Sequence, residues 1–374
     1  MNSMVHKEWY LINEVEQLDS PALVFYKERI TENIAILTKS ISSLSRLRPH
    51  VKTHKNAEIT RLLLEAGITK FKCATIAEAE MLGICGVPDV LLAYQPVGPK
   101  IDRFIQLIRS YPETFFSCVI DNTFSLQAIA LAALSAGVKV GLFLDLNGGM
   151  NRTGILAGED ALKLYLQADL EKGVEMRGLH VYDGHIHDAD LSIRKEKAAA
   201  VLVPVRELSR QIVENGLPQP VIIAGGTPTF PVYAEMEDLE CSPGTFIFWD
   251  KGYQDAFAEQ QYLPAALVLT RVISLTDATK ITVDLGHKSV AAENVLQKRV
   301  YFLNAPFAKM ISQSEEHLVL ELEAGHGFRI GDVLYGLPVH ICPTVALYGS
   351  ASIVDQHQVT AQWKIISRER KITI

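Results

Sequence analysis

The sequence has little of several features that would point to a particular class of protein. Its five cysteines are an odd number among 374 residues and show no short-spacing framework, which argues against a disulfide-stapled scaffold. No run approaches about 18 consecutive apolar residues, so we expect no membrane-spanning helix. The formal net charge of −7 argues against a nucleic-acid-binding protein, which normally has a basic surface. Residues 1–20 lack the basic segment and apolar run of a signal peptide. We therefore expect a cytoplasmic protein with reduced thiols.

The first two thirds of the chain alternate short apolar runs with amphipathic stretches. The candidate strands are residues 22–26, 48–53, 70–75, 89–94, 117–121, 139–146, 176–182 and 220–226. Apolar runs of this length between helices predict parallel strands that are buried on both faces. An unbroken series of strand–helix units favours a (β/α)8 TIM-type barrel over an open, doubly wound sheet.

After about residue 250 the pattern changes to strands separated by turns, as in ALVLTRVISL (266–275) and DVLYGLP (332–338). This pattern predicts a second, mostly β domain. We place the barrel domain at residues 21–248 and assign residues 1–20 and 249–374 to the β domain.

The segment RPHVKTHKNAE (48–58) ends a candidate strand in a cluster of basic residues. Groups at the carboxyl ends of barrel strands point into the active site. A partly desolvated lysine beside other cations has a lowered pKa and becomes a nucleophilic amine, which makes Lys52 a candidate for Schiff-base chemistry. The alternative is a solvated basic loop.

Glycine-rich turns follow three further strands. In DLNGGMNRTG (145–154), Arg152 offers a bidentate fork for a carboxylate, although an ordinary turn would look similar. AGGTPT (224–229) and CSPGTF (241–246) combine exposed backbone N–H groups with a hydroxyl, which suits a phosphate. Both lack the GK[ST] ending of a Walker loop.

Two histidine-containing segments could carry chemistry. GLHVYDGHIHD (178–188) could bind a metal, move protons or line a cofactor ring. In HIC (340–342), His340 and Cys342 are two positions apart and on a strand would face the same side, where they could bind one metal ion. Two protein ligands would leave open positions, as in catalytic metal sites, whereas the alternative is a buried cysteine near a hydrogen-bonded histidine.

Together these segments resemble the fold-type III pyridoxal-phosphate enzymes, and within them the D-threonine aldolase and D-serine dehydratase family. The resemblance runs from DSPALVFYKERITENI to HICPTVALY, nearly the whole chain. It implies an alanine-racemase-like fold, in which a (β/α)8 barrel precedes a mostly β domain. It also implies a homodimer. From the net charge and the lack of long apolar runs we expect no nucleic-acid or membrane partner.

The same resemblance implies roles for individual residues. RPHVKTHK resembles the family's cofactor-lysine motif, so Lys52 would form the Schiff base with pyridoxal 5′-phosphate. GMNRTG is similar to the arginine turn of alanine racemases, which implies a catalytic role for Arg152. His185 is the third catalytic candidate. The implied cofactor contacts besides Lys52 are His180, Tyr182, His187, Gly226, Thr227, Gly244 and Thr245. His340 and Cys342 would bind a divalent ion, zinc or manganese.

The implied activity is that of a lyase dependent on pyridoxal phosphate and a divalent metal, with D-β-hydroxy amino acids as substrates. We expect a D-threonine aldolase-like reaction, which breaks the Cα–Cβ bond to give glycine and an aldehyde. The alternatives are β-elimination of the D-serine dehydratase type and a metal-independent racemase. A non-catalytic pyridoxal-phosphate carrier is less compatible with the strand-rich region after residue 250.

Overall fold

The computed structural model describes residues 8–374, which form two compact units. The barrel unit contains residues 36–52, 56–246 and 369–374, and the sheet unit contains the described residues up to Ala35, Thr53–Lys55 and Ile247–Arg368. None of the five cysteines, all among the described residues, forms a disulfide. Over the same residues no helix has the length and apolar character needed to cross a membrane.

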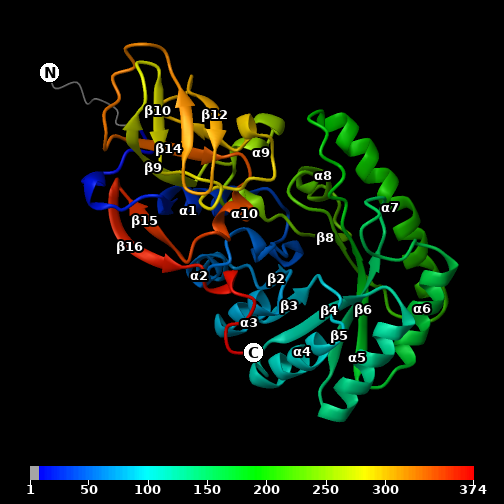
Figure 1. Cartoon of the computed structure of the whole chain (residues 1–374). Helices are drawn as coiled ribbons and strands as arrows, with labels where there is room; N and C mark the ends of the chain where they lie inside the picture. The colour runs from blue at the N-terminus through cyan, green and yellow to red at the C-terminus, as the bar shows by residue number, and fades with distance from the viewer. Residues whose placement is uncertain (1–7) are drawn as a thin grey trace. The chain divides into compact units, whose positions relative to one another are not determined.

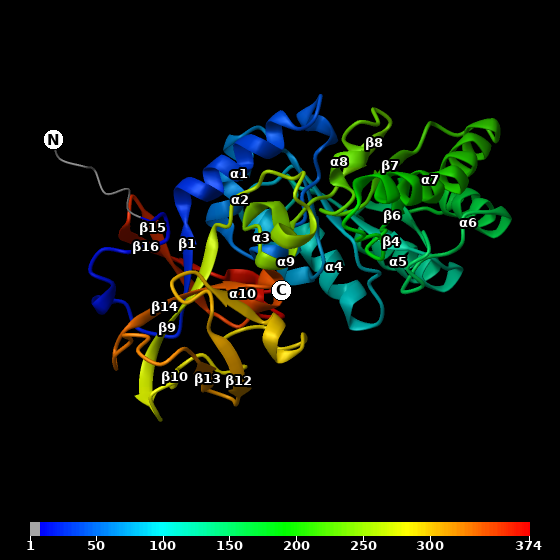
Figure 2. The same cartoon turned by 90° about the horizontal axis from the view of Figure 1, so that it is seen from above.

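Seven parallel strands form the sheet of the barrel unit, in sequence order (Figure 1). They are β2 (Lys70–Cys73), β3 (Asp89–Leu92), β4 (Phe115–Ile120), β5 (Val140–Leu146), β6 (Val174–Val181), β7 (Val221–Ala224) and β8 (Leu239–Cys241). The helices that alternate with them are α2 (Ala57–Glu65), α3 (Ile76–Ile84), α4 (Pro99–Ser110), α5 (Thr123–Ala136), α6 (Glu159–Leu170), α7 (Leu191–Glu214) and α8 (Phe230–Tyr233). Polar side chains define several helix starts, because Asn56, Thr75 and Asn122 each accept a backbone N–H of the first turn. Helices α3, α5 and α6 pack on the strands from outside (Figure 2).

Residues 47–50 join the two ends of this sheet. Leu47 forms a parallel bridge with Cys241 of β8, and His50 forms one with Lys72 of β2. The N–H of Arg48 donates to the Cys241 carbonyl at 2.9 Å, and the N–H of Lys72 donates to the Pro49 carbonyl at 2.9 Å. The ring of strands is therefore closed and leaves no sheet edge, which confirms the predicted barrel.

The interior of the barrel contains a network of charged side chains. Arg48, only 1% exposed, donates to Glu240 at 2.7 Å and to Asp89 at 2.7 and 3.3 Å. Lys70 also pairs with Glu240, and Arg177 lies 3.4 Å from Asp89. The residues of this network come from residues 47–50, which we call the closing segment, and from β2, β3, β6 and β8. The network therefore connects strands that are far apart in sequence.

The sheet unit contains the other, mostly antiparallel sheet. Its strands are β1 (Ala22–Tyr26), β9 (Ala266–Leu275), β10 (Lys280–Val283), β11 (Val300–Phe302), β12 (Lys309–Gln313), β13 (Leu318–Glu321), β14 (Val333–Pro338), β15 (Ser350–Asp355) and β16 (Gln358–Lys364). Helix α1 (Lys27–Lys39) follows β1, while α9 (Lys251–Ala256) and α10 (Ile341–Val345) are short. The predicted mostly β character after residue 250 is confirmed.

Two sequence predictions about the barrel need correction. Residues 22–26 were a candidate strand of the barrel domain, but β1 pairs with β9 and β15 of the sheet unit. The barrel unit therefore starts at residue 36 rather than 21, and it also includes residues 369–374. Strand β8 was missed because it has three residues and a charged Glu240 in its centre, so it shows no apolar run.

We predict that Arg48→Met destabilises the protein by about 3 to 5 kcal/mol, because it leaves two largely buried carboxylates without their main partner. Urea unfolding at pH 7 measures the loss. The control is Arg206→Met on α7, which removes an exposed pair with Asp238 and should cost no more than about 1 kcal/mol. Equal losses for the two variants would contradict a structural role of the interior network.

Candidate active site in the barrel

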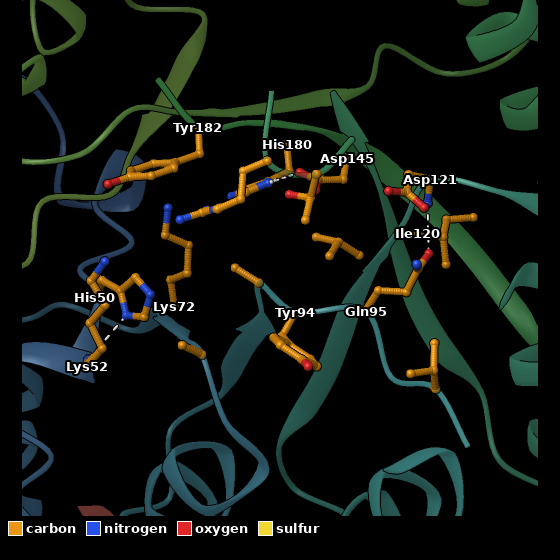
Figure 3. A pocket seen from close by; sticks show the side chains of 16 residues that line it. His50, Lys52, Lys72, Tyr94, Gln95, Ile120, Asp121, Asp145, His180 and Tyr182 are labelled. Atoms are coloured by element: carbon orange, nitrogen blue, oxygen red, sulfur yellow. Dashed lines mark hydrogen bonds and ion pairs between the residues drawn. The ribbon is translucent and has the colours of Figure 1, made fainter. Parts of the chain in front are cut away.

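A cavity of about 520 Å³ opens at the carboxyl ends of the barrel strands (Figure 3). It is lined by the residues that end or follow β2 to β6 and by the closing segment. The polar lining residues are His50, Lys52, Lys72, Tyr94, Gln95, Asp121, Asp145, Arg152, Thr153, His180 and Tyr182. This is the face of a barrel on which active sites are built.

Three basic side chains lie near the ring of Tyr182 in this cavity. The Nζ atoms of Lys52 and Lys72 lie 5.6 and 5.7 Å from the ring centroid, and the guanidinium carbon of Arg152 lies 5.0 Å from it. The backbone N–H of Lys52 donates to Nδ1 of His50 at 3.2 Å. The structure thus brings the predicted residues Lys52, Arg152 and Tyr182 together.

His180, a predicted cofactor contact, also lines the cavity, and it forms a hydrogen bond with Asp145. Its Nδ1 is 2.7 Å from the Asp145 carboxylate. Burial lowers the pKa of His180, and the hydrogen bond to Asp145 only partly opposes this effect. Burial acts to raise the pKa of Asp145, but the hydrogen bonds from His180 and Thr153 and the nearby positive charge together outweigh it, so the pKa falls below its usual value. The pair is therefore a neutral imidazole that donates from Nδ1 to an ionised carboxylate.

The other ring nitrogen of His180 marks the site as one for a polar ligand. Nε2 is buried and has no hydrogen-bond partner among the described residues. Buried polar atoms without a partner are rare in folded proteins and call for an explanation. In the tautomer that Asp145 selects, Nε2 is an acceptor, so it suits a ligand that brings a donor.

The two glycine–threonine turns lie against each other. Oγ1 of Thr227 accepts the backbone N–H groups of both Gly244 and Thr245 at 3.0 Å. Gly226 lies beside Tyr182, because a Cβ at this position would be 3.2 Å from a carbon of the Tyr182 ring. The hydroxyl of Thr227 therefore holds the two turns together through these N–H groups. The paired turns thus adjoin a ring that lines the cavity.

His185 and His187 do not reach the cavity, which corrects two sequence expectations. The chain turns after Tyr182, where the N–H of Ile186 donates to the Asp183 carbonyl at 2.8 Å. Both histidines beyond this turn are exposed, and His185 lines a separate hollow beside Gly148. The structure therefore gives no support for catalysis by His185 or for a cofactor contact by His187.

His340 and Cys342 are close together, but not for the predicted reason. His340 precedes α10 in an extended conformation, and Cys342 lies in the first turn of that helix, so the pair is not on a strand. Nδ1 of His340 lies 2.5 Å from Glu293, and Sγ of Cys342 lies 3.1 Å from Oγ1 of Thr53. Burial acts to lower the pKa of His340, but hydrogen bonds to Cys342 and Glu293 outweigh it and raise the pKa to about 9. Among residues 8–374, no group of three or more His, Cys, Asp or Glu side chains could hold a metal ion.

Lys72 and Asp145 line the cavity, but neither was predicted as a site residue from the sequence. Lys72 is 2% exposed, and burial followed by the charge of Lys52 lowers its pKa to about 7. One signal was present, since a lysine in KFKCAT interrupts a strand that was predicted to be buried. Asp145 was quoted as the start of the Arg152 turn, but only the fold shows that it pairs with His180.

Family models match two consecutive parts of the chain. The model "Alanine racemase, N-terminal domain" matches residues 26–251, and the model "Putative serine dehydratase domain" matches residues 265–354. The chain is 25% identical over 368 residues to the 3-hydroxy-D-aspartate aldolase of Paracoccus denitrificans, covering 94% of this chain and 92% of that one.

Solved structures show the same fold. The D-threonine aldolase from Filomicrobium marinum superposes with a TM-score of 0.87 at 24% identity, covering 96% of this chain and 97% of that one. A cysteine-to-alanine mutant of D-threo-3-hydroxyaspartate dehydratase, solved in a metal-free form, has a TM-score of 0.82 at 23% identity, covering 94% and 98% of the two chains.

We predict that Asp145→Asn lowers the free energy of unfolding by about 1.5 to 3 kcal/mol at pH 7, because it removes a buried, charged acceptor of a hydrogen bond. The folded-state pKa of Asp145 is depressed, so its contribution is complete above about pH 4 and is lost as the pH falls through the folded-state pKa. Chemical denaturation from pH 3 to pH 7 should show a constant difference from wild type above pH 5 that shrinks in acid. Exposed Asp160→Asn on α6 is the control, and an acid-independent difference for Asp145→Asn would contradict the assignment.

Proposed function

The chain belongs to the alanine racemase N-terminal domain family, and from this premise we propose that it is a pyridoxal-phosphate-dependent lyase for D-amino acids that carry a β-hydroxyl group. The observation that carries the proposal is the convergence of Lys52, Arg152 and Tyr182 in one cavity at the carboxyl ends of the barrel strands. A second support is that relatives over nearly the full length of the chain bear the names of such lyases.

The cavity residues fit pyridoxal phosphate. Lys52 supplies an amine, Arg152 supplies donors for an anionic group, and Tyr182 supplies a flat face. The phosphate would lie at the paired turns Gly226–Thr227 and Gly244–Thr245, which adjoin the Tyr182 ring. The unpartnered Nε2 of His180 offers an acceptor to the same ligand. When bound there, the cofactor supplies an electron sink for negative charge that develops at the substrate Cα.

The chain's own groups have separate tasks in this scheme. Arg152 offers a planar fork of donors that can bind a carboxylate or another anionic oxygen and so orient the substrate. The Asp145–His180 pair keeps one tautomer of the imidazole, and therefore one acceptor, facing the ligand. In a dehydration, the amine of Lys52 would remove the proton from Cα. In a retro-aldol cleavage, a base would instead remove the proton of the β-hydroxyl group.

His340 and Cys342 would be the protein ligands of a divalent ion, zinc or manganese, for which nitrogen and sulfur are suitable donors. Glu293 lies where a carboxylate would orient a ligating histidine through its other ring nitrogen. With two protein ligands, the remaining coordination positions stay open to water or substrate.

We favour retro-aldol cleavage over dehydration, because the named relatives compared above include aldolases for 3-hydroxy-D-aspartate and D-threonine. Dehydration is the second candidate, since residues 265–354 match the serine dehydratase domain. A racemase would need a second base and no metal. A homodimer in the cytoplasm is the assembly and location that we propose by the same resemblance.

We predict that Lys52→Ala abolishes the visible absorbance band of attached pyridoxal phosphate and reduces turnover of D-threonine by at least about 1000-fold, because no other residue is assigned its covalent role. Absorbance spectra of purified protein with added cofactor measure attachment. Lys55→Ala is the matched control from the same basic motif and should retain the band. A band that persists in Lys52→Ala would place the attachment elsewhere.

We predict that EDTA abolishes lyase activity and that added Mn²⁺ or Zn²⁺ restores it, because a divalent ion held by His340 and Cys342 would supply the Lewis acid for the reaction. His340→Ala and Cys342→Ala should each reduce activity by at least about 100-fold at standard metal concentration. Cys85→Ala serves as the control for loss of a thiol. Glycine and an aldehyde as products would identify an aldolase, whereas a keto acid and ammonia would identify a dehydratase. Full activity in EDTA would contradict the metal assignment.

A further inference from the structure

Lys72 is a second lysine in the cavity, and nothing in the sequence motifs assigns it a role. Its side chain and that of Lys52 both point toward the ring of Tyr182 (Figure 3), at 5.7 and 5.6 Å from the centroid. Lys72 lies near the end of strand β2, where it forms a bridge with His50, and Lys52 follows His50 in the 3-10 helix η3 (Val51–Thr53). The bridge and the hydrogen bond from the Lys52 N–H to Nδ1 of His50 keep the backbones of the two lysines close together.

Lys70 and Lys72 lie two positions apart on β2, yet their surroundings differ. Lys70 forms an ion pair with Glu240. Lys72, which is more deeply buried, has no carboxylate within ion-pair distance among residues 8–374. A buried ammonium group without a partner is costly, so the uncharged amine is favoured at this position.

The groups that face Lys72 come from every neighbouring element. Residues 47–50 contribute Arg48 and His50, and the following η3 contributes Lys52. The other neighbours that carry no negative charge are Arg152 on the β5–α6 turn, His180 and Tyr182 at the end of β6, and Cys241 on β8. The carboxylates are Asp145 and Asp183, which act to raise the pKa of Lys72. Asp145 is already paired with His180, and Asp183 accepts from Thr229 and Tyr233. Burial and the charge of Lys52 outweigh both carboxylates and lower the pKa of Lys72 to about 7.

We propose, on the basis of the proposed function, that Lys72 is the acid–base partner of Lys52 and takes the proton that Lys52 must lose before it can bond to the cofactor. The ammonium group of Lys52 transfers one proton to the neutral amine of Lys72. The freed amine of Lys52 then attacks the aldehyde carbon of pyridoxal phosphate, a C=N bond forms, and the aldehyde oxygen leaves as water. The proton stays on Lys72 and returns when Lys52 is released. Lys72 thus acts through Lys52 and is a positioning residue for proton transfer.

The test measures attachment of pyridoxal phosphate to the cofactor-free full-length protein by stopped-flow absorbance from pH 6 to pH 9.5. The wild-type rate should rise through a midpoint near pH 7, where Lys72 loses its proton. Lys72→Met should attach cofactor roughly 100-fold more slowly at pH 7.5, with a midpoint shifted toward the ordinary lysine value of about 10. Lys72→Arg should be equally slow, because the guanidinium group stays protonated and cannot accept a proton.

The matched control is Lys70→Met, which removes the same type of residue from the same strand. It should keep the wild-type midpoint even if the barrel is less stable, since Lys70 pairs with Glu240 and not with the site. Wild-type attachment kinetics in folded Lys72→Met, or in Lys72→Arg, would overturn the proposal. An equal shift in Lys70→Met would also overturn it, because it would trace the effect to the total charge of the barrel.

A second measurement needs no cofactor and keeps the two proposals distinguishable. Competitive acetylation of the protein at a series of pH values, with mass spectrometry of the peptide that contains Lys72, should give a midpoint near pH 7. This midpoint should rise in Lys52→Met, which removes a neighbouring positive charge. A midpoint near 10 in the wild type would refute the role of Lys72. If Lys52→Ala loses the cofactor while Lys72→Met attaches it normally, the proposed function stands and this inference fails.

Discussion

The hydrogen bonds that join residues 47–50 to β8 on one side and to β2 on the other are the constraint on which the barrel and its cavity depend. They close the ring of strands and fix the point at which the chain leaves it, immediately before Lys52. Arg48 strengthens the same junction from inside, because it is bonded to carboxylates from β3 and β8. Since backbone bonds set this geometry, the direction of Lys52 does not depend on a flexible loop.

Basic side chains in the barrel interior are paired with carboxylates deep in the barrel but not at its mouth. Deeper in the barrel, every cation of the network formed by Arg48, Lys70 and Arg177 is paired with Asp89 or Glu240. At the mouth, the side chains of Lys52, Lys72 and Arg152 all lie near the ring of Tyr182. Among the described residues, none of the three has a carboxylate at ion-pair distance. Paired charge stabilises the barrel, whereas unpaired basic groups at the mouth create affinity for anions. The same barrel therefore has a structural level and a binding level.

Several parts of the fold and site could be predicted because they depend on consecutive residues. The alternation of apolar runs and helices predicted the barrel, and the basic motif after a candidate strand predicted that Lys52 lies at the active-site end of the barrel, where it lines the cavity. The turns at Thr227 and Gly244 were predicted to act together, and they are in contact. The prediction for His340 and Cys342 was correct in their proximity but wrong in its geometry, since an extended residue before α10 brings them together instead of a strand.

The sequence by itself determined the type of each local element and the chemical character of Lys52, Arg152 and the glycine-rich turns, because these properties arise within a few neighbouring residues. Only the tertiary structure decided which strands pair, and so it moved β1 to the sheet unit and added β8 to the barrel. It also turned His185 away from the cavity, and it distinguished Lys72 from Lys70. The physical reason is the same in each case: pairing and burial depend on partners that are distant in the chain, and no local pattern specifies them.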